Sequence, residues 1–89
     1  MALYFAAHTT ACLTKQAMRR LMKELLDAPG IPEVTVRRCV ASQLAGRMIT
    51  EVEAPDQATL ERFFEVRHMN WQWLMRIDLD AHDRDVSEF

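Results

Sequence analysis

The sequence predicts an α+β fold: one small domain in which the order strand, helix, strand occurs twice. Three observations support this prediction. The chain has 89 residues, which is room for one domain with a thin core. Several segments are short and β-branched, apolar or alternating, as strands are. Others show the three- and four-residue spacing of apolar side chains that is typical of an amphipathic helix.

The first strand and the first helix are the clearest elements. The apolar, aromatic run 3–8 is typical of a buried strand. Thr14 is a good N-cap for a helix predicted over 15–28, and Pro29-Gly30 is expected to end that helix. The apolar stripe of this helix consists of Met18, Leu21, Met22, Leu25 and Leu26.

The middle of the chain predicts a pair of strands. Residues 34–41 and 47–53 are β-branched or alternating, and a turn is expected between them at 42–46, so the two strands should pair antiparallel. In the second of these strands one face is expected to carry Met48, Thr50 and Val52, and the other Ile49, Glu51 and Glu53.

The second helix and the final strand complete the domain. Asp56 is the expected N-cap of a helix whose stripe consists of Leu60, Phe63, Phe64 and Arg67. Strict alternation of apolar residues predicts a last strand over 71–80, with its first residues alternatively part of the preceding helix turn. These elements close most simply into a four-stranded antiparallel sheet with both helices on one face, the ferredoxin-like βαββαβ arrangement. The domain is expected to span 1–80, and the polar, acidic C-terminal tail 81–89 to be loose.

Composition and charge exclude several classes of function. The formal net charge is −2 and no basic stripe is interleaved with aromatic residues, so no nucleic acid partner is expected. There is no signal-peptide pattern and no apolar run of about 20 residues, so the expectation is a cytoplasmic protein with no membrane association. The two cysteines, Cys12 and Cys39, are too few for a disulfide scaffold.

The sheet face that the helices leave uncovered predicts self-association. We expect this face to be mixed to apolar, and an apolar face of that size is more than a monomer usually exposes. A homodimer or a higher homo-oligomer that stacks these faces is therefore expected, and a monomer with a wet face is the alternative. The residues expected on this face are Tyr4, Ala6 and His8 on the first strand, Met48, Thr50 and Val52 or their neighbours on the third, and Leu74 on the last.

Candidate site residues gather near the end of the first strand. His8 is a candidate general base or metal ligand, although a partly buried histidine bonded to a neighbour is the commoner finding. With Cys12 four residues later and His68 after the second helix, it forms a candidate metal set. A candidate ligand pocket is lined by Tyr4, Phe5, Trp71 and Trp73, although tryptophans are more often core or interface anchors.

Charged residues form three further groups, each more simply explained as a solvated surface. Alternating Asp78, Asp80 and His82 are metal-like in type, but charges at a sheet edge usually prevent aggregation. Glu51 and Glu53 form a carboxylate pair suited to proton transfer only inside a pocket. The basic face of the first helix, which contains Arg19, Arg20 and Lys23, would suit an acidic partner.

The stretch 46–56 (Gly-Arg-Met-Ile-Thr-Glu-Val-Glu-Ala-Pro-Asp) resembles the third-strand-to-second-helix junction of a family of small bacterial ferredoxin-like domains. That family is mostly uncharacterised and includes a nickel-binding member; the positions of His8 and His68 are similar too. The layout also resembles that of muconolactone isomerase, including a last strand like 74–80. Both groups are dimeric α+β barrels. The resemblance implies a divalent metal such as nickel, but Thr50 stands where the nickel-binding relatives have cysteine, which weakens that implication.

Three functions therefore remain open at this point. The first is a homodimeric domain that binds a small ligand or a divalent metal at the sheet face. The second is a small enzyme of the isomerase, cyclase or cofactor-free oxygenase type, with His8 or a carboxylate moving a proton. The third is a protein-interaction module. A fold does not decide between them.

Overall fold

The computed structural model describes residues 1–10, 13–26 and 33–88. Cys12, the end predicted for the first helix and the Pro29-Gly30 stop lie outside these residues. In chain order the elements are β1 (Ala2–Thr9), α1 (Lys15–Leu26), β2 (Thr35–Ser42), β3 (Arg47–Ala54), α2 (Gln57–Val66), β4 (Trp73–Arg76), β5 (Leu79–His82) and β6 (Asp85–Glu88). The predicted α+β class is confirmed.

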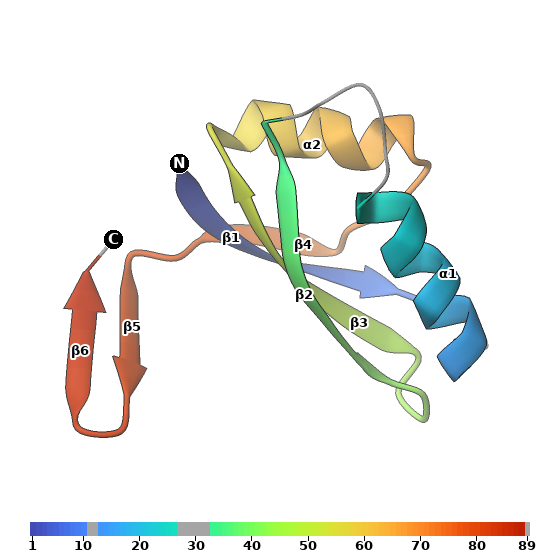
Figure 1. Ribbon diagram of the computed structural model, residues 1–89, viewed down its shortest axis with the longest axis horizontal. Coiled ribbons are helices and arrows are strands. Elements are labelled where there is room, and N and C mark those ends of the chain that lie inside the picture. The colour runs from blue at the N-terminus through green and yellow to red at the C-terminus, as the bar shows by residue number, and fades with distance from the viewer. Residues whose placement is uncertain (11–12, 27–32, 89) are drawn as a thin grey trace.

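Four strands form one antiparallel sheet in the order β2-β3-β1-β4, so β1 and β3 lie in its centre (Figure 1). β1 pairs with β3 over its full length, from Ala2 opposite Ala54 to Thr9 opposite Arg47. β2 pairs with β3 on both sides of a bulge between Val36 and Arg38. The central position of β1 is consistent with its composition, because strands that are paired on both sides are usually rich in apolar residues.

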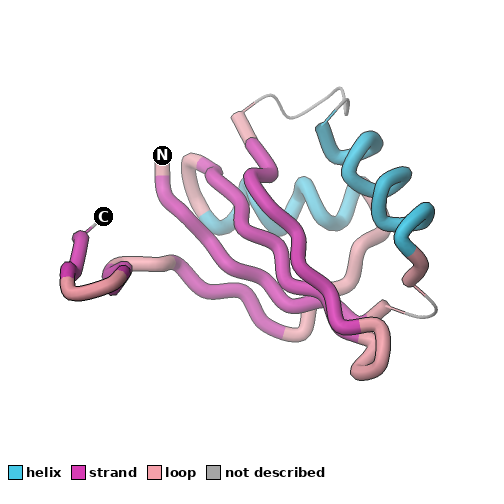
Figure 2. Tube along the Cα trace, turned by 60° about the horizontal axis from the view of Figure 1, so that its bottom comes forward, coloured by secondary structure: helices cyan, strands magenta, loops and turns pink. Residues whose placement is uncertain are grey.

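Both helices cover the same face of the sheet (Figure 2). The predicted N-caps are confirmed: the Ala17 amide donates to Thr14 Oγ1 at 3.0 Å, and the Thr59 amide donates to Asp56 Oδ1 at 2.7 Å. These bonds satisfy amide groups that have no partner within the helix. The core between helices and sheet consists of Tyr4, Ala6, Leu25, Val36, Val52, Ala54, Leu60, Phe63 and Phe64.

The last strand is shorter than predicted. β4 ends at Arg76, and after two residues the chain forms a separate two-stranded antiparallel hairpin of β5 and β6. The segment 81–88, predicted as a loose tail, therefore belongs mainly to a hairpin that begins at Leu79. The apolar positions Ala81 and Val86 face each other across it, and Asp83 turns the chain with a φ of 58°.

The hairpin projects from the rest of the molecule at the end opposite α1 (Figures 1 and 2). All ten of its residues, 79–88, are exposed. Neither helix, over the residues that the structure describes, is both long and apolar enough to cross a bilayer.

Candidate functional site

The register of the strands determines which side chains occupy the uncovered sheet face. Val36, Val52 and Tyr4 face the helices, so their neighbours along each strand point the other way. The open face is therefore formed by Leu3, Phe5, Ala7, Arg38, Val40, Ile49, Glu51, Glu53, Trp73 and Met75. We call this set the open face.

This assignment corrects the predicted one. Tyr4, Ala6 and His8 were expected on the uncovered side, and Met48, Thr50 and Val52 were one of the two sets expected there on the third strand. All six are buried under the helices, and the neighbours of the third-strand set are on the open face. Leu74 likewise packs against the core. The inversion arises because both faces of β1 are apolar, so its alternation does not say which face the helices cover. That the open face contains exposed apolar side chains still holds: Val40, Ile49, Trp73 and Met75 are all exposed.

A cavity of about 220 Å³ lies on the open face. It is lined by Phe5 from β1, Arg38 and Val40 from β2, and Ile49 and Glu51 from β3. Phe5 is opposite Glu51 and Val40 is opposite Ile49, so the lining residues occupy two neighbouring rows across three strands. Three apolar side chains, one guanidinium and one carboxylate thus surround the space.

The β2 bulge brings two consecutive arginines beside the carboxylates of β3. Arg38 pairs in register with Glu51. Arg37 contacts Glu53 at 3.0 Å and Glu51 at 3.9 Å. These groups are partly exposed, so the ion pairs stabilise the fold little. Their consequence is local: Arg37 neutralises part of the negative charge at the border of the cavity.

His8 lies under the helices, on the opposite side of the sheet from this cavity. It is 2% exposed. Its Nδ1 donates to the backbone carbonyl of Asn70 at 2.6 Å, and its Nε2 accepts from the hydroxyl of Thr50 at 2.9 Å. The ring edge packs against Phe64, with centroids 4.9 Å apart. Burial lowers the pKa of His8 below its ordinary value because it disfavours the charged imidazolium, and the bond to Asn70 opposes this only in part.

The structure places His68 near His8 but does not form a metal site from the residues it describes. His68 follows α2 with a φ of 55° and is exposed. Both histidines border a cavity of about 180 Å³. A ligand at His8 would have to displace the Thr50 hydroxyl, because both ring nitrogens already have partners. Within residues 1–10, 13–26 and 33–88 no three His, Cys, Asp or Glu side chains are grouped around one point. Cys12, the third predicted ligand, lies outside them.

The four residues predicted to line a ligand pocket are not brought together. Tyr4 is buried in the core under the helices. Phe5 and Trp73 are on the open face, but only Phe5 borders the cavity there. Trp71 packs against the core, with its ring 5.8 Å from that of Phe64. Of the predicted pocket residues, Phe5 alone lies in the candidate site.

Sequence reasoning missed Arg38, Val40, Ile49 and Glu51 as pocket residues. One signal was available. In β3 the carboxylates of Glu51 and Glu53 alternate with Val52 and Ala54, and unpaired carboxylates are not buried in a core. The face of Glu51 must therefore be the open one, and antiparallel pairing extends that assignment to the neighbouring strands.

Comparison with known proteins supports the fold. No family model matches the chain, and no curated protein matches its sequence. The crystal structure of SCO4226 from Streptomyces coelicolor A3(2) is similar, with a TM-score of 0.81. The alignment covers 90% of this chain and 100% of that chain, at 16% sequence identity. At this sequence identity the likeness shows that the two chains share a compact α+β fold.

Proposed function

We propose that the chain is a self-associating, ferredoxin-like domain of the dimeric α+β barrel type that holds a small, mainly apolar molecule between two open faces. The observation that carries this proposal is the cavity lined by Phe5, Val40 and Ile49 in the middle of an exposed apolar sheet face. Its volume of about 220 Å³ is below the roughly 300–1,000 Å³ usual for a ligand pocket. A second copy stacked on the face would add the missing wall.

The polar lining indicates the kind of ligand. An apolar body would contact Phe5, Val40 and Ile49, and a single polar or anionic group would reach Arg38 at the border. Glu51 on the other side would disfavour a second anionic group by like-charge repulsion. A small aromatic or alicyclic compound with one carboxylate or hydroxyl therefore fits best.

The proposal is tested by combining an association measurement with a probe of apolar sites. Sedimentation equilibrium of the wild type is expected to give twice the monomer mass, and Ile49→Glu to give a monomer, because a charge at the centre of the interface is costly to bury. 8-Anilinonaphthalene-1-sulfonate should bind the wild type and lose at least tenfold in affinity in Ile49→Glu.

The matched control is Val66→Glu, which places the same charge at an exposed apolar position of α2, away from the open face. This variant should keep both dimer and probe binding. The proposal would be overturned if the wild type sedimented at the monomer mass of 10.4 kDa and did not raise the fluorescence of the probe.

An isomerase-like enzyme is the second candidate, and the cavity gives it a specific form. Among the lining residues, Glu51 is the group able to accept a proton, whereas His8 is on the other side of the sheet. If turnover of a small unsaturated acid were found, Glu51→Gln should abolish it while His8→Gln should not. Loss of turnover in both folded variants would point away from this cavity.

A divalent metal is not part of the proposal, because both ring nitrogens of His8 have hydrogen-bond partners. Native mass spectrometry with added nickel distinguishes a metal-binding domain from a domain that binds an apolar ligand. A stoichiometric nickel adduct that His8→Gln and Cys12→Ser both remove would establish a metal site at the end of β1 and displace the present proposal.

A further inference from the structure

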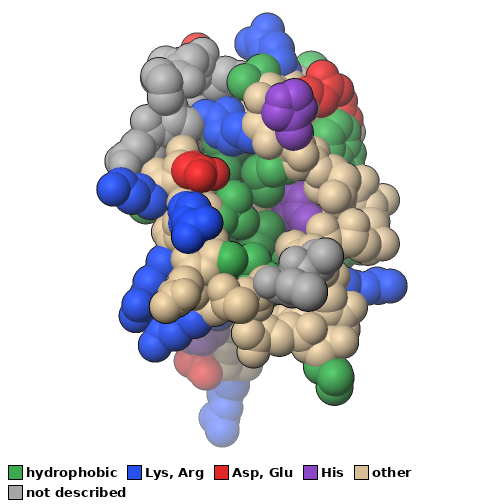
Figure 3. Space-filling view, turned by 90° about the vertical axis from the view of Figure 1, so that its right-hand side faces the viewer, with side chains coloured by type: hydrophobic (Ala, Val, Ile, Leu, Met, Phe, Trp, Pro, Cys, Tyr) green, Lys and Arg blue, Asp and Glu red, His purple; other side chains and the backbone are tan. Residues whose placement is uncertain are grey.

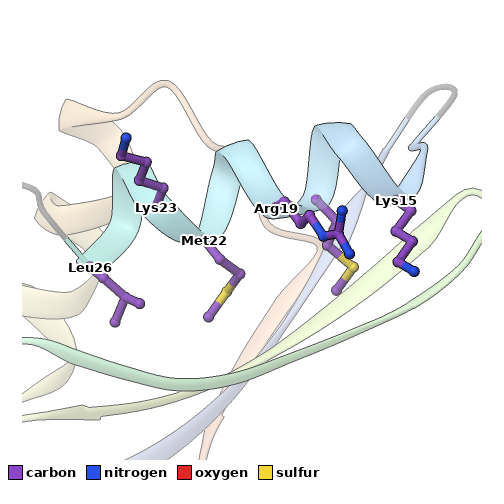
Figure 4. Close-up of a pocket in the computed structure, with 6 residues that line it drawn as sticks. Lys15, Arg19, Met22, Lys23 and Leu26 are labelled. Carbon is purple, nitrogen blue, oxygen red and sulfur yellow. The ribbon is translucent and has the colours of Figure 1, made fainter.

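A second surface of the molecule, on α1, combines apolar and basic side chains. A groove of about 590 Å³ runs along this helix and is lined by Lys15, Met18, Arg19, Met22, Lys23 and Leu26. Met22 and Leu26 extend from α1 toward the strands, Lys15 and Arg19 lie on the same side, and Lys23 points away from the strands (Figure 4). The groove therefore has a floor of flexible apolar side chains and a cationic border.

The helix is only partly anchored to its own sheet. Leu25 is its one buried residue, Met18 and Met22 are half-buried, and Leu26 is 62% exposed. Seen from this side, Lys and Arg side chains gather along one edge of the molecule (Figure 3). An amphipathic helix with a covered stripe would not present such a surface.

The hairpin β5–β6 has the complementary composition. The register pairs Ala81 with Val86 and Leu79 with Glu88, so all four of these residues share one face. Leu79 is 62% exposed and Val86 is 60% exposed. The segment 78–88 carries five carboxylates and one arginine, whereas α1 carries four cationic side chains and one carboxylate. One face of the hairpin thus combines three apolar side chains with the carboxylate of Glu88, and the segment is acidic in total.

One chain cannot bring these two surfaces together, because hairpin and α1 lie at opposite ends of the molecule in both views (Figures 1 and 2). A contact between two copies of the chain can bring them together. In a two-fold symmetric dimer this contact would form twice, because the hairpin of each copy would reach α1 of the other copy. An isolated two-stranded hairpin is at best marginally stable in water, so this one needs a surface to pack on.

We propose that the C-terminal hairpin of one copy docks on the α1 groove of a second copy. Leu79 and Val86 pack on Met18, Met22 and Leu26, and the carboxylate of Glu88, on the same hairpin face, lies within reach of the cations at the border of the groove. The proposal goes beyond the stacking of open faces, because it uses a different surface of the molecule and a different part of the chain. Salt should weaken it, since its border is electrostatic.

Charge reversal in two separate chains tests this contact. The helix variant is Lys15→Glu with Arg19→Glu, and the hairpin variant is Glu88→Lys, which lies on the hairpin face that carries Leu79 and Val86. In each variant alone, like charges meet at both copies of the contact, and the dimer dissociation constant should rise at least tenfold at 50 mM salt. Mixed one to one, the two variants should form a heterodimer with near wild-type affinity, because opposite charges then meet at both contacts.

The matched control is Arg20→Glu with Arg62→Glu, which changes the net charge as the helix variant does but lies outside the groove. Its dissociation constant should remain within about threefold of the wild type, as distant surface charges are screened. Helix and hairpin variants that dimerise as the wild type does, or whose mixture gains nothing, would overturn hairpin docking. The open-face proposal would survive that result, because it is tested at Ile49, on a different surface of the molecule.

Discussion

At the residue scale, His8 shows how the fold accommodates a buried imidazole. It is held as a neutral ring, because Nδ1 keeps its proton for the Asn70 carbonyl and Nε2 accepts from Thr50. A charged ring would lose the second bond and would have no carboxylate to pair with among the partners in the structure. The residue most suggestive of chemistry in the sequence is therefore bonded through both ring nitrogens to other parts of the same chain.

The lowered pKa of His8 predicts how stability depends on pH. In the unfolded chain His8 takes up a proton near pH 6.5, but in the folded chain its pKa lies below that value. Above pH 6.5 the contribution of the neutral ring is complete. As the pH falls below 6.5 the unfolded state binds more protons, so the free energy of unfolding should fall by up to about 1.4 kcal/mol per pH unit.

Urea unfolding between pH 7.5 and pH 5.5, at one protein concentration, measures this dependence. His8→Gln should flatten it, whereas His82→Gln should leave it unchanged, because His82 is exposed in the hairpin. An equal pH slope in wild type and His8→Gln would contradict the assignment.

Thr50 gives a second prediction at this scale. Its hydroxyl is fully buried and donates to His8 Nε2. Thr50→Val preserves the shape but leaves a buried acceptor without a donor, so it should lower the free energy of unfolding by about 1–3 kcal/mol. Thr35→Val, at an exposed position of the edge strand β2, should change it by less than about 0.5 kcal/mol. Equal effects would show that the hydroxyl bond contributes nothing.

At the scale of elements, the two helices differ in how firmly they are held. α2 buries Leu60, Phe63 and Phe64 against the central strands, whereas α1 buries Leu25 alone. The apolar stripe of each helix was predictable from spacing, and so were both N-caps, because these signals are local. What spacing does not reveal is how deeply a stripe is buried, since that depends on the whole sheet.

The firm anchoring of α2 leads to a prediction for Phe64. Its ring is fully buried and contacts His8, Phe63 and Trp71. Phe64→Ala should lower the free energy of unfolding by about 3–5 kcal/mol, through lost burial and the cavity left behind. Val66→Ala, two residues later but exposed, should cost less than about 1 kcal/mol. Denaturant titration of both variants measures these losses. Similar losses of unfolding free energy in the two variants would contradict the described packing.

The strands show where sequence reasoning stopped. Alternation in β3 correctly separated Met48 and Val52 from Ile49 and Glu51. For β1 it could not say which side the helices cover, because Tyr4 and Phe5 are equally suited to a core. The candidate site therefore moved from the face of His8 to the face of Phe5. The C-terminal hairpin was missed because a short, charged strand carries little of the composition by which strands are recognised.

At the scale of the whole molecule, the exposed surface is larger than the chain length suggests. The accessible surface is 6373 Å², against about 5,400 Å² for a compact monomer of this mass by size scaling. The difference, about 1,000 Å², is similar to what each partner buries in a stable interface. The open face, the α1 groove and the projecting hairpin are the places where this surface is apolar.

If a second copy covers that surface, thermal stability should depend on protein concentration. Association stabilises only the folded state, so the melting temperature should rise by about 3–5 °C for each tenfold increase in concentration. Differential scanning fluorimetry from 1 to 100 μM measures this. Ile49→Glu should melt at a constant temperature over that range, whereas Val66→Glu should retain the wild-type rise. A wild type whose melting temperature does not change would mean that this chain is stable alone with its sheet face in water, and that the cavity at Phe5 is only a surface depression.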